Sequence, residues 1–304
     1  MSAAQTVPRW RQVVRDLRWA LRERSKWSSP WRFVAFRCLL QLGLHEKIVF
    51  RYAGARFRLF NTRLTLLMFY DAPRWHGAYD LKVLFALLRA GDTVLDIGAN
   101  VGTHCIPLAK RLGTASQVHA FEPHPRVFGY LCANMQLNRL SNLHLYNYAL
   151  GETEGEVCFT DLGADDLNRV ADLQQNAPTI RVPMRPLDSF ECALRPTTLI
   201  KVDVEGYELF VLRGAERALA NTQLLYIEAC DAHTKRYGYT VRDLVEFLNR
   251  RGWALYQVEL AEHVRLRPIA DAYTGEQWQN WLGVRDLQWL QARAPVEVVH
   301  PDAP

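Results

Sequence analysis

Residues 94–102 read Val-Leu-Asp-Ile-Gly-Ala-Asn-Val-Gly and decide the fold class of this 304-residue chain. A short apolar run ends at Asp96, Gly98 and Gly102 frame a tight turn, and helical spacing begins at about residue 103. Glycines let the backbone turn sharply and let a ligand come close. Open α/β sheets build nucleotide sites from a strand, a glycine turn and a helix in this order. We therefore predict such a sheet, with a ligand at the carboxyl ends of its strands.

The spacing of this turn also indicates the kind of ligand. It is Asp-x-Gly-x-x-x-Gly, which differs from the Gly-x-Gly-x-x-Gly of dinucleotide-binding sheets. No compact cradle for a pyrophosphate is present, whereas an acid beside the turn suits a ligand with an amine or a positive charge. S-adenosylmethionine carries both an ammonium and a sulfonium. The turn thus favours this cofactor, and an ordinary strand-to-helix turn is the alternative.

The next two strands end in residues that suit the rest of a nucleoside. Glu122 follows the apolar run 117–121, and a carboxylate at this place can accept two hydrogen bonds from a ribose diol. Pro123 then prevents the strand from continuing. Asn147 lies at the end of the third strand, where adenine is expected. We predict that Glu122 binds ribose and that Asn147 contacts adenine, with a plain turn residue as the alternative for Asn147.

Strand-like and helix-like segments alternate along most of the chain, which predicts a parallel sheet with helices on both faces. The segment 151–186 is acidic and rich in loops, and we interpret it as an insertion near the ligand mouth. Residues 47–60 predict a β-hairpin, and residues 280–286 a last, antiparallel strand. The expected strands are 93–97, 117–121, 143–148, 198–203, 224–229 and 253–258, and the expected helices are 78–90, 103–112, 125–138, 207–220 and 240–251.

Acids at two further strand ends predict where the chemistry takes place. Asp203 and Glu205 follow the strand 198–203, and Glu228 ends the next strand, with His233 shortly after it. Methyl transfer to a hydroxyl requires the methyl and the oxygen in line, and a base that takes the proton. Glu205 is our first choice for the base. The alternatives are a helix-capping acid for Glu205, an orienting acid for Asp203, a backbone ligand for Glu228 and a surface histidine for His233.

Composition excludes several classes of protein. The six cysteines are scattered singly and the nine histidines lack ligand spacing, so we expect no metal and a reducing, cytoplasmic location.

The first 60 residues hold 13 Lys and Arg against 3 Asp and Glu, a net charge of +10. Residues 9–44 contain basic, tryptophan-edged apolar segments, which predict contact with the anionic inner membrane surface; packing on the domain or on a partner is the alternative. No nucleic-acid module accompanies the charge, and no uncharged apolar run is long enough for a membrane-spanning helix.

Together these motifs resemble the FkbM-type methyltransferases. The resemblance covers roughly residues 47–286, and the block 203–206, Asp-Val-Glu-Gly, is its most specific part. One departure is Asp80 after Tyr79, where the family usually has Glu. The residues that carry the resemblance are Tyr79-Asp80, Asp96 to Gly102, Phe121 to Pro125, Ile200 to Glu208 and Ile227-Glu228.

The resemblance implies a class I, Rossmann-like, doubly wound sheet of seven strands with S-adenosylmethionine as cofactor. It implies that Asp96, Gly98, Asn100 and Gly102 form the methionine-side loop, that Glu122 is the ribose acid, and that Asp203 and Glu205 lie at the rim. Family members mostly methylate hydroxyls of sugars, glycolipids or polyketide-like products.

We accordingly expect three regions. They are a basic helical N-terminal extension (1–46), a methyltransferase domain (47–290) and a C-terminal tail (291–304). Two other functions stay open. One is a nicotinamide-dependent oxidoreductase on a related sheet, which the missing third glycine disfavours. The other is a catalytically silent protein that binds membranes or partners, which the intact acids disfavour.

Overall fold

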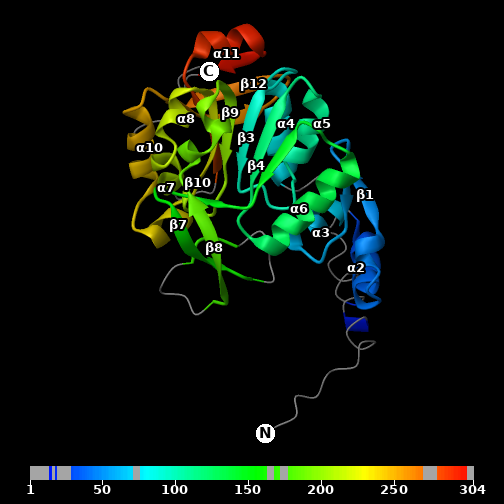
Figure 1. Cartoon of the computed structure of the whole chain (residues 1–304). Coiled ribbons are helices and arrows are strands. Elements are labelled where there is room, and N and C mark those ends of the chain that lie inside the picture. Colours follow the sequence, from blue (N-terminus) through cyan, green and yellow to red (C-terminus); the bar gives the residue numbers. More distant parts are fainter. Residues whose placement is uncertain are drawn as a thin grey trace.

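The computed structural model describes residues 14, 15, 18, 29–70, 76–162, 168–171, 177–269 and 279–299. A nine-stranded sheet forms its centre (Figure 1). Its strands are β3 (Thr93–Ile97), β4 (Gln117–Phe121), β5 (Leu143–Tyr146), β9 (Thr197–Val202), β10 (Thr222–Ala229), β11 (Ala254–Leu260), β12 (Val264–Pro268), β13 (Gln279–Val284) and β14 (Val296–Val298). Their order is β14-β12-β11-β13-β10-β9-β3-β4-β5. The five strands from β10 to β5 run parallel, and β13 pairs antiparallel with β10 and β11. The predicted doubly wound, mostly parallel α/β sheet is confirmed.

Two strands go beyond the seven that we expected. β12 returns antiparallel along β11, and β14 pairs parallel with β12 after helix α11 (Leu287–Arg293). These strands cover the edge of β11. An unpaired edge exposes backbone N–H and C=O groups that can pair with another chain. The expectation of a separate tail over 291–304 is therefore wrong for residues up to Val298, which complete the sheet.

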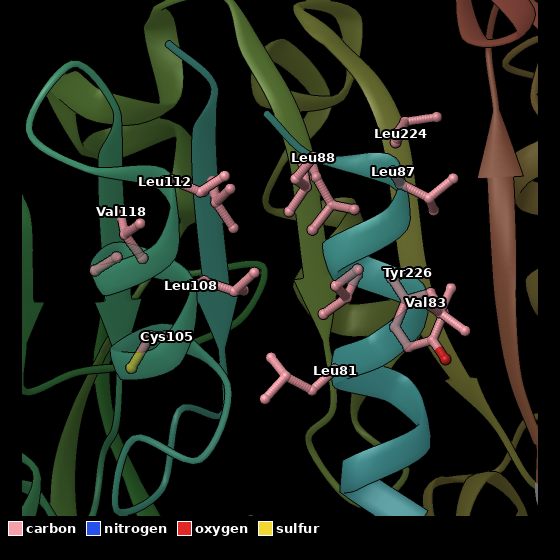
Figure 2. Close-up of a cluster of buried hydrophobic side chains, with 14 of the residues drawn as sticks. Leu81, Val83, Leu87, Leu88, Cys105, Leu108, Leu112, Val118, Leu224 and Tyr226 are labelled. Atoms are coloured by element: carbon pink, nitrogen blue, oxygen red, sulfur yellow. The ribbon is translucent and has the colours of Figure 1, made fainter. Parts of the chain in front are cut away.

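Helices cover both faces of the sheet because alternate strand residues point to opposite sides. Val94 and Val118 belong to the core under α4 (His76–Leu87), α5 (Cys105–Leu112) and α6 (Pro125–Asn138). Leu95 and Ile200 belong to the core under α7 (Glu208–Arg213), α8 (Glu216–Ala220) and α10 (Val241–Asn249). Figure 2 shows part of the first core, with leucines of α4 and α5 beside Val118 of β4 and Leu224 of β10.

The helix predicted over 207–220 is two helices in the structure. The chain breaks at Gly214, between α7 and α8, and a Cβ atom at this position would lie 2.0 Å from the carbonyl oxygen of Gly151. The backbone of the break therefore packs directly against the start of the insertion. A continuous helix would separate these two segments.

The N-terminal part of the described chain attaches to helix α6. Its elements are α2 (Pro30–Gln41), η2 (His45–Lys47), β1 (Val49–Tyr52), β2 (Ala55–Arg58) and α3 (Arg63–Tyr70). β1 and β2 form the predicted hairpin, which turns at Ala53 and Gly54 with positive φ angles. Side-chain oxygens of Asn134 and Asn138 on α6 accept hydrogen bonds from the backbone N–H groups of β2, at 3.0 and 2.8 Å. The first half of the predicted helical extension (1–46) lies mostly outside the described residues.

The predicted insertion forms a small sheet of its own. β6 (Ala149–Leu150), β7 (Gly155–Thr160) and β8 (Thr179–Arg185) pair in the order β6-β8-β7. Its core contains Phe159, Val170, Val182 and Met184, and Figure 1 shows that β7 and β8 project from the main sheet. Two turns of 3-10 helix, η4 (Leu187–Ser189) and η5 (Glu191–Leu194), then lead into β9.

The remaining short elements follow β10. They are α9 (Asp231–Thr234) and η6 (Lys235–Tyr237), which connect β10 to α10. Among the helices that the structure describes, none combines the length and the apolar character needed to span a bilayer.

We predict that Gly98→Ala destabilises the protein much more than Gly252→Ala. Both glycines have φ near +80°, but a Cβ at Gly98 would lie 1.9 Å from the carbonyl oxygen of Asp203, whereas a Cβ at Gly252 meets nothing within 4 Å. Strained φ alone costs about 1–3 kcal/mol, and overpacking adds roughly another 1–3 kcal/mol at Gly98. Urea unfolding of both variants measures the difference. Equal losses would mean that the β3 turn does not touch the β9 turn.

Candidate active site

The carboxyl ends of four neighbouring strands open onto one cavity of about 450 Å³. A volume of this size is typical of sites for small molecules and cofactors. The strand-end residues that line it are Gly98 and Asn100 after β3, Glu122 after β4, Asp203 and Glu205 after β9, and Glu228 on β10; His233 of α9 joins them. Seven residues predicted from separate motifs thus meet in a single pocket.

Glu122 fastens the turn after β3 to the turn after β4. Its Oε2 accepts a hydrogen bond from the backbone N–H of Asn100 (2.9 Å), and its Oε1 accepts one from the backbone N–H of His124 (2.9 Å). Asn100 itself has a φ of +51°, so this bond holds an unusual backbone conformation. Glu122 is one of the residues that line the pocket.

Asp96 lies beneath the pocket and is not among its lining residues. The carboxylate is fully buried: Oδ2 accepts a hydrogen bond from the backbone N–H of Cys105 (3.1 Å), at the start of α5. Oδ1 lies 3.3 Å from Nζ of Lys201, which lies 3.2 Å from Oδ2 of Asp203. Burial opposes the charged form of Lys201, but Asp203 and Asp96 together raise its pKa above the ordinary value. The lysine therefore stays protonated and joins the ends of β3 and β9.

Two other residues predicted to bind the cofactor make close contacts within the protein framework. Gly102 does not line the pocket, and a Cβ there would lie 2.4 Å from a carbon of Ile106 and 2.8 Å from one of Leu131. Asn147 donates from Nδ2 to the carbonyl oxygens of Glu122 (2.8 Å) and Pro123 (2.9 Å), and it too lies outside the lining. Asp96, Gly102 and Asn147 thus lie outside the pocket lining and contact the turns that form it; their direct contacts with the cofactor stay a prediction.

The four predicted catalytic residues lie along one side of the cavity. Nδ1 of His233 lies 3.3 Å from Oε2 of Glu228 and 3.4 Å from Oε2 of Glu205. We call Glu205, Glu228 and His233 the Glu–Glu–His cluster. Glu205 has a φ of +58° and is followed by Gly206 with a φ of +104°, so the chain turns sharply to bring its carboxylate to the pocket.

Glu208 supports this turn from within the core. Its Oε1 accepts hydrogen bonds from the backbone N–H groups of Val204 (3.2 Å) and Gly206 (3.0 Å). Tyr239 donates its hydroxyl to Oε2 at 3.2 Å. Burial, together with the negative charge of Glu228, raises the pKa of Glu208 to about 8. The side chain is therefore mostly neutral at pH 7.

Several residues that line the pocket were not predicted from the sequence. Phe159, Asn168 and Val170 of the insertion line one part of it. Arg63 of α3 and Asp80 of α4 line another, and Asp80 accepts a hydrogen bond from the hydroxyl of Tyr226 (2.6 Å). Only Asp80 had a signal, its place after an aromatic residue in the motif. The others lie in segments without a recognisable pattern.

A family model for the FkbM methyltransferase domain matches residues 96–254, which is more than half of the chain. The chain belongs to the FkbM methyltransferase family. Its cofactor is S-adenosylmethionine, so the nicotinamide-dependent alternative is dropped.

Two methyltransferases are similar to this chain. The hexuronic acid methyltransferase AglP of Haloferax volcanii is 28% identical over 151 residues, which cover 49% of this chain and 60% of that protein. Methyltransferase 1 of Beauveria bassiana is 30% identical over 145 residues, covering 40% and 58%. The chain therefore spans about 60% of the length of these relatives. The crystal structure of an FkbM methyltransferase from Methylobacillus flagellatus superposes with a TM-score of 0.43 at 15% identity, covering 91% of this chain and 58% of that one.

The residues of this FkbM chain fit the cofactor. Glycines at the β3 turn allow the backbone to approach a ligand, and Gly98 and Asn100 border the cavity. Glu122 presents a buried carboxylate where a ribose diol can be bound. The described lining carries five carboxylates against one arginine, Arg63, so the pocket favours a ligand with positive charge such as a sulfonium.

We predict that Glu208→Gln flattens the pH dependence of stability. The pKa of Glu208 is higher in the folded protein, about 8, than the ordinary 4.5, so the folded state binds the extra proton. Stability of the wild type should therefore fall as pH rises from about 5 to about 8, by at most about 1.4 kcal/mol per pH unit from this group. Gln keeps the Oε1 acceptor and cannot ionise. Urea unfolding at pH 5.5 and pH 8.0 tests this, and parallel slopes for both proteins would contradict it.

Proposed function

We propose that this FkbM methyltransferase transfers the methyl group to a hydroxyl of a sugar, glycolipid or natural-product acceptor. The observation that carries the proposal is the Glu–Glu–His cluster beside the cofactor pocket, because a hydroxyl needs a hydrogen-bond acceptor and a place for its proton. The printed name of the Haloferax volcanii relative, a hexuronic acid methyltransferase, supports a sugar as one class of acceptor. A catalytically silent protein remains the alternative.

The roles of the residues follow from their positions. S-adenosylmethionine, when bound, supplies a methyl group on a positively charged sulfur. Glu122 would hold the ribose diol, and Gly98 and Asn100 would let the methionine end approach the backbone. Glu205 would meet the acceptor hydroxyl and Asp203 would orient the reacting groups, while Glu228 and His233 hold Glu205 in place. Much of the rate can come from this alignment, because holding two reactants in line removes several kcal/mol of the entropic barrier.

The insertion is the proposed source of acceptor specificity. Phe159, Asn168 and Val170 reach the same cavity as the cofactor residues, and the hydroxyl of Tyr237 donates to the carbonyl oxygen of Val170 at 2.7 Å. Tyr237 also packs edge-on against Tyr207, which lines the pocket beside the cluster. Apolar rings with a few polar groups are a suitable wall for a sugar or a polyketide.

We predict that Glu122→Ala weakens the binding of S-adenosylhomocysteine by about 1–3 kcal/mol, or roughly 5- to 150-fold in Kd, because charged hydrogen bonds are lost. Isothermal titration measures the change. The control is Glu154→Ala, because the side chain of Glu154 is 73% exposed and does not line the pocket. Unchanged affinity in Glu122→Ala would remove Glu122 from the ribose role, and a folded wild type that binds no cofactor product at near-millimolar concentration would refute the proposed function.

The acceptor is identified by transfer of labelled methyl to a fractionated cell extract, followed by mass analysis of the product. Label on a hydroxyl oxygen supports the proposal. Label on nitrogen or carbon would contradict O-methylation while leaving the family intact. Cofactor binding without any turnover would favour the silent alternative.

We also propose that residues 9–44 contact an anionic, cytoplasmic membrane surface. In the described part of this segment, Trp31 and Leu42 are 67% and 69% exposed, and Arg32 follows Trp31 directly in the chain. Exposed tryptophan and leucine next to basic residues suit the interface of an anionic bilayer. Liposomes with anionic lipid should pellet the full chain and should pellet a chain without residues 1–44 less. Equal pelleting of the two would overturn this proposal, and neutral liposomes serve as the control.

A further inference from the structure

The Glu–Glu–His cluster has a geometry that goes beyond a hydrogen-bonding role. Each of its three residues offers one ligand atom, and these three atoms lie within 4.8 Å of one another. They come from the turn after β9, the end of β10 and helix α9, so the tertiary fold creates the group. Ligands of an octahedral ion at about 2.1 Å lie about 3 Å apart when adjacent and about 4.2 Å apart when opposite. Small side-chain movements would therefore close the cluster on an ion.

Burial separates this cluster from acidic groups on the surface. The side chain of Glu228 is 3% exposed, and those of Glu205 and His233 are each 20% exposed. Packing holds the backbone of all three residues. Glu228 is paired with Asn280 of β13. The backbone at Gly206, next to Glu205, approaches the carbonyl oxygen of His233 so closely that a Cβ there would lie 2.6 Å from it. Donors held this closely by packed backbone form a preorganised site, which lowers the cost of binding an ion.

The charges around the cluster favour a cation. Two carboxylates share one imidazole nitrogen, and that nitrogen donates at most one proton. The other acids of the described lining have different partners: Asp80 has the hydroxyl of Tyr226, Glu122 has backbone N–H groups and Asp203 has Lys201. The negative charge of Glu228 also contributes to the raised pKa of Glu208. A positive ion at the cluster would lie beside both carboxylates and interact favourably with each.

We propose that Glu205, Glu228 and His233 bind a divalent cation of the manganese type. Carboxylate oxygens suit Mg²⁺ and Mn²⁺, and the imidazole favours Mn²⁺ over Mg²⁺. Three protein ligands leave coordination positions open toward the pocket. The proposal rests on the proposed function in one respect, because it assigns those positions to the acceptor. The spacing of histidines and cysteines along the chain gives no sign of this site, since its ligands belong to three segments.

With an ion bound, Glu205 would meet the acceptor hydroxyl through the ion rather than directly. A bound divalent ion lowers the pKa of a coordinated hydroxyl and positions it for attack. The carbon–sulfur bond of the cofactor breaks as the carbon–oxygen bond forms, and the hydroxyl proton leaves to solvent water. No electron is gained or lost in the step. Acceptors with two neighbouring oxygens, such as sugar diols, would fill two open positions.

The experiment is a titration of the chelator-treated full chain with Mn²⁺, followed by electron paramagnetic resonance of the free ion. We expect one equivalent to bind. Replacing a residue that only hydrogen-bonds to a metal ligand typically lowers metal affinity about 10- to 100-fold. Glu228→Gln changes a ligand itself, so we expect it to weaken Mn²⁺ binding at least tenfold. Glu154→Gln is the matched control and should bind as the wild type does.

Each outcome separates the two proposals. Wild-type protein that binds S-adenosylhomocysteine but no Mn²⁺ overturns the ion site and leaves the proposed function standing. Protein that is folded by circular dichroism but binds neither refutes both. If Glu228→Gln fails to fold, Glu205→Gln takes its place, because that side chain lies at the rim. Mn²⁺ binding that neither variant weakens places the ion elsewhere and also overturns the site.

Discussion

A buried lysine between two aspartates holds the ends of two neighbouring strands together, and the pocket depends on it. Lys201 lies 3% exposed between Asp96 on β3 and Asp203 after β9. Removing one partner of a buried ion pair is strongly unfavourable, because a charge is then left without compensation. The pair of strands is further fixed by the close approach of Gly98 to the carbonyl oxygen of Asp203. The end of β3 carries the glycine turn and the end of β9 carries Asp203 and Glu205, so this contact sets the distance between them.

The acids of the pocket differ in function because they differ in partners. The carboxylate of Glu122 is oriented by backbone N–H groups, and that of Asp203 by Lys201. Glu208 is buried and largely neutral, so it acts as a hydrogen-bonding brace for the turn rather than as a charge. The remaining two, Glu205 and Glu228, meet at His233.

The insertion and α3 contribute residues to the cavity at the carboxyl ends of the strands. Phe159 and Val170 of the insertion line the cavity. The start of the insertion, at Gly151, packs against the backbone of Gly214 between α7 and α8. On another side, the hairpin and α3 are attached to α6 through Asn134 and Asn138. The sheet thus supplies the strand-end residues of the cavity, and α3 and the insertion supply further residues of its lining.

The sequence by itself determined the alternation of strands and helices from β3 to β11, apart from the break at Gly214, and the antiparallel strand β13. It also placed Gly98, Asn100, Glu122, Asp203, Glu205 and Glu228 at strand ends. Such features are local, because apolar periodicity, glycine turns and prolines act on neighbouring residues. Only the tertiary structure decided that Asp96 lies beneath the pocket, that Asn147 braces a turn and that residues 296–298 complete the sheet. The Glu–Glu–His cluster is of the same kind. Distances between segments far apart in the chain depend on packing and strand pairing, which no single stretch of sequence contains.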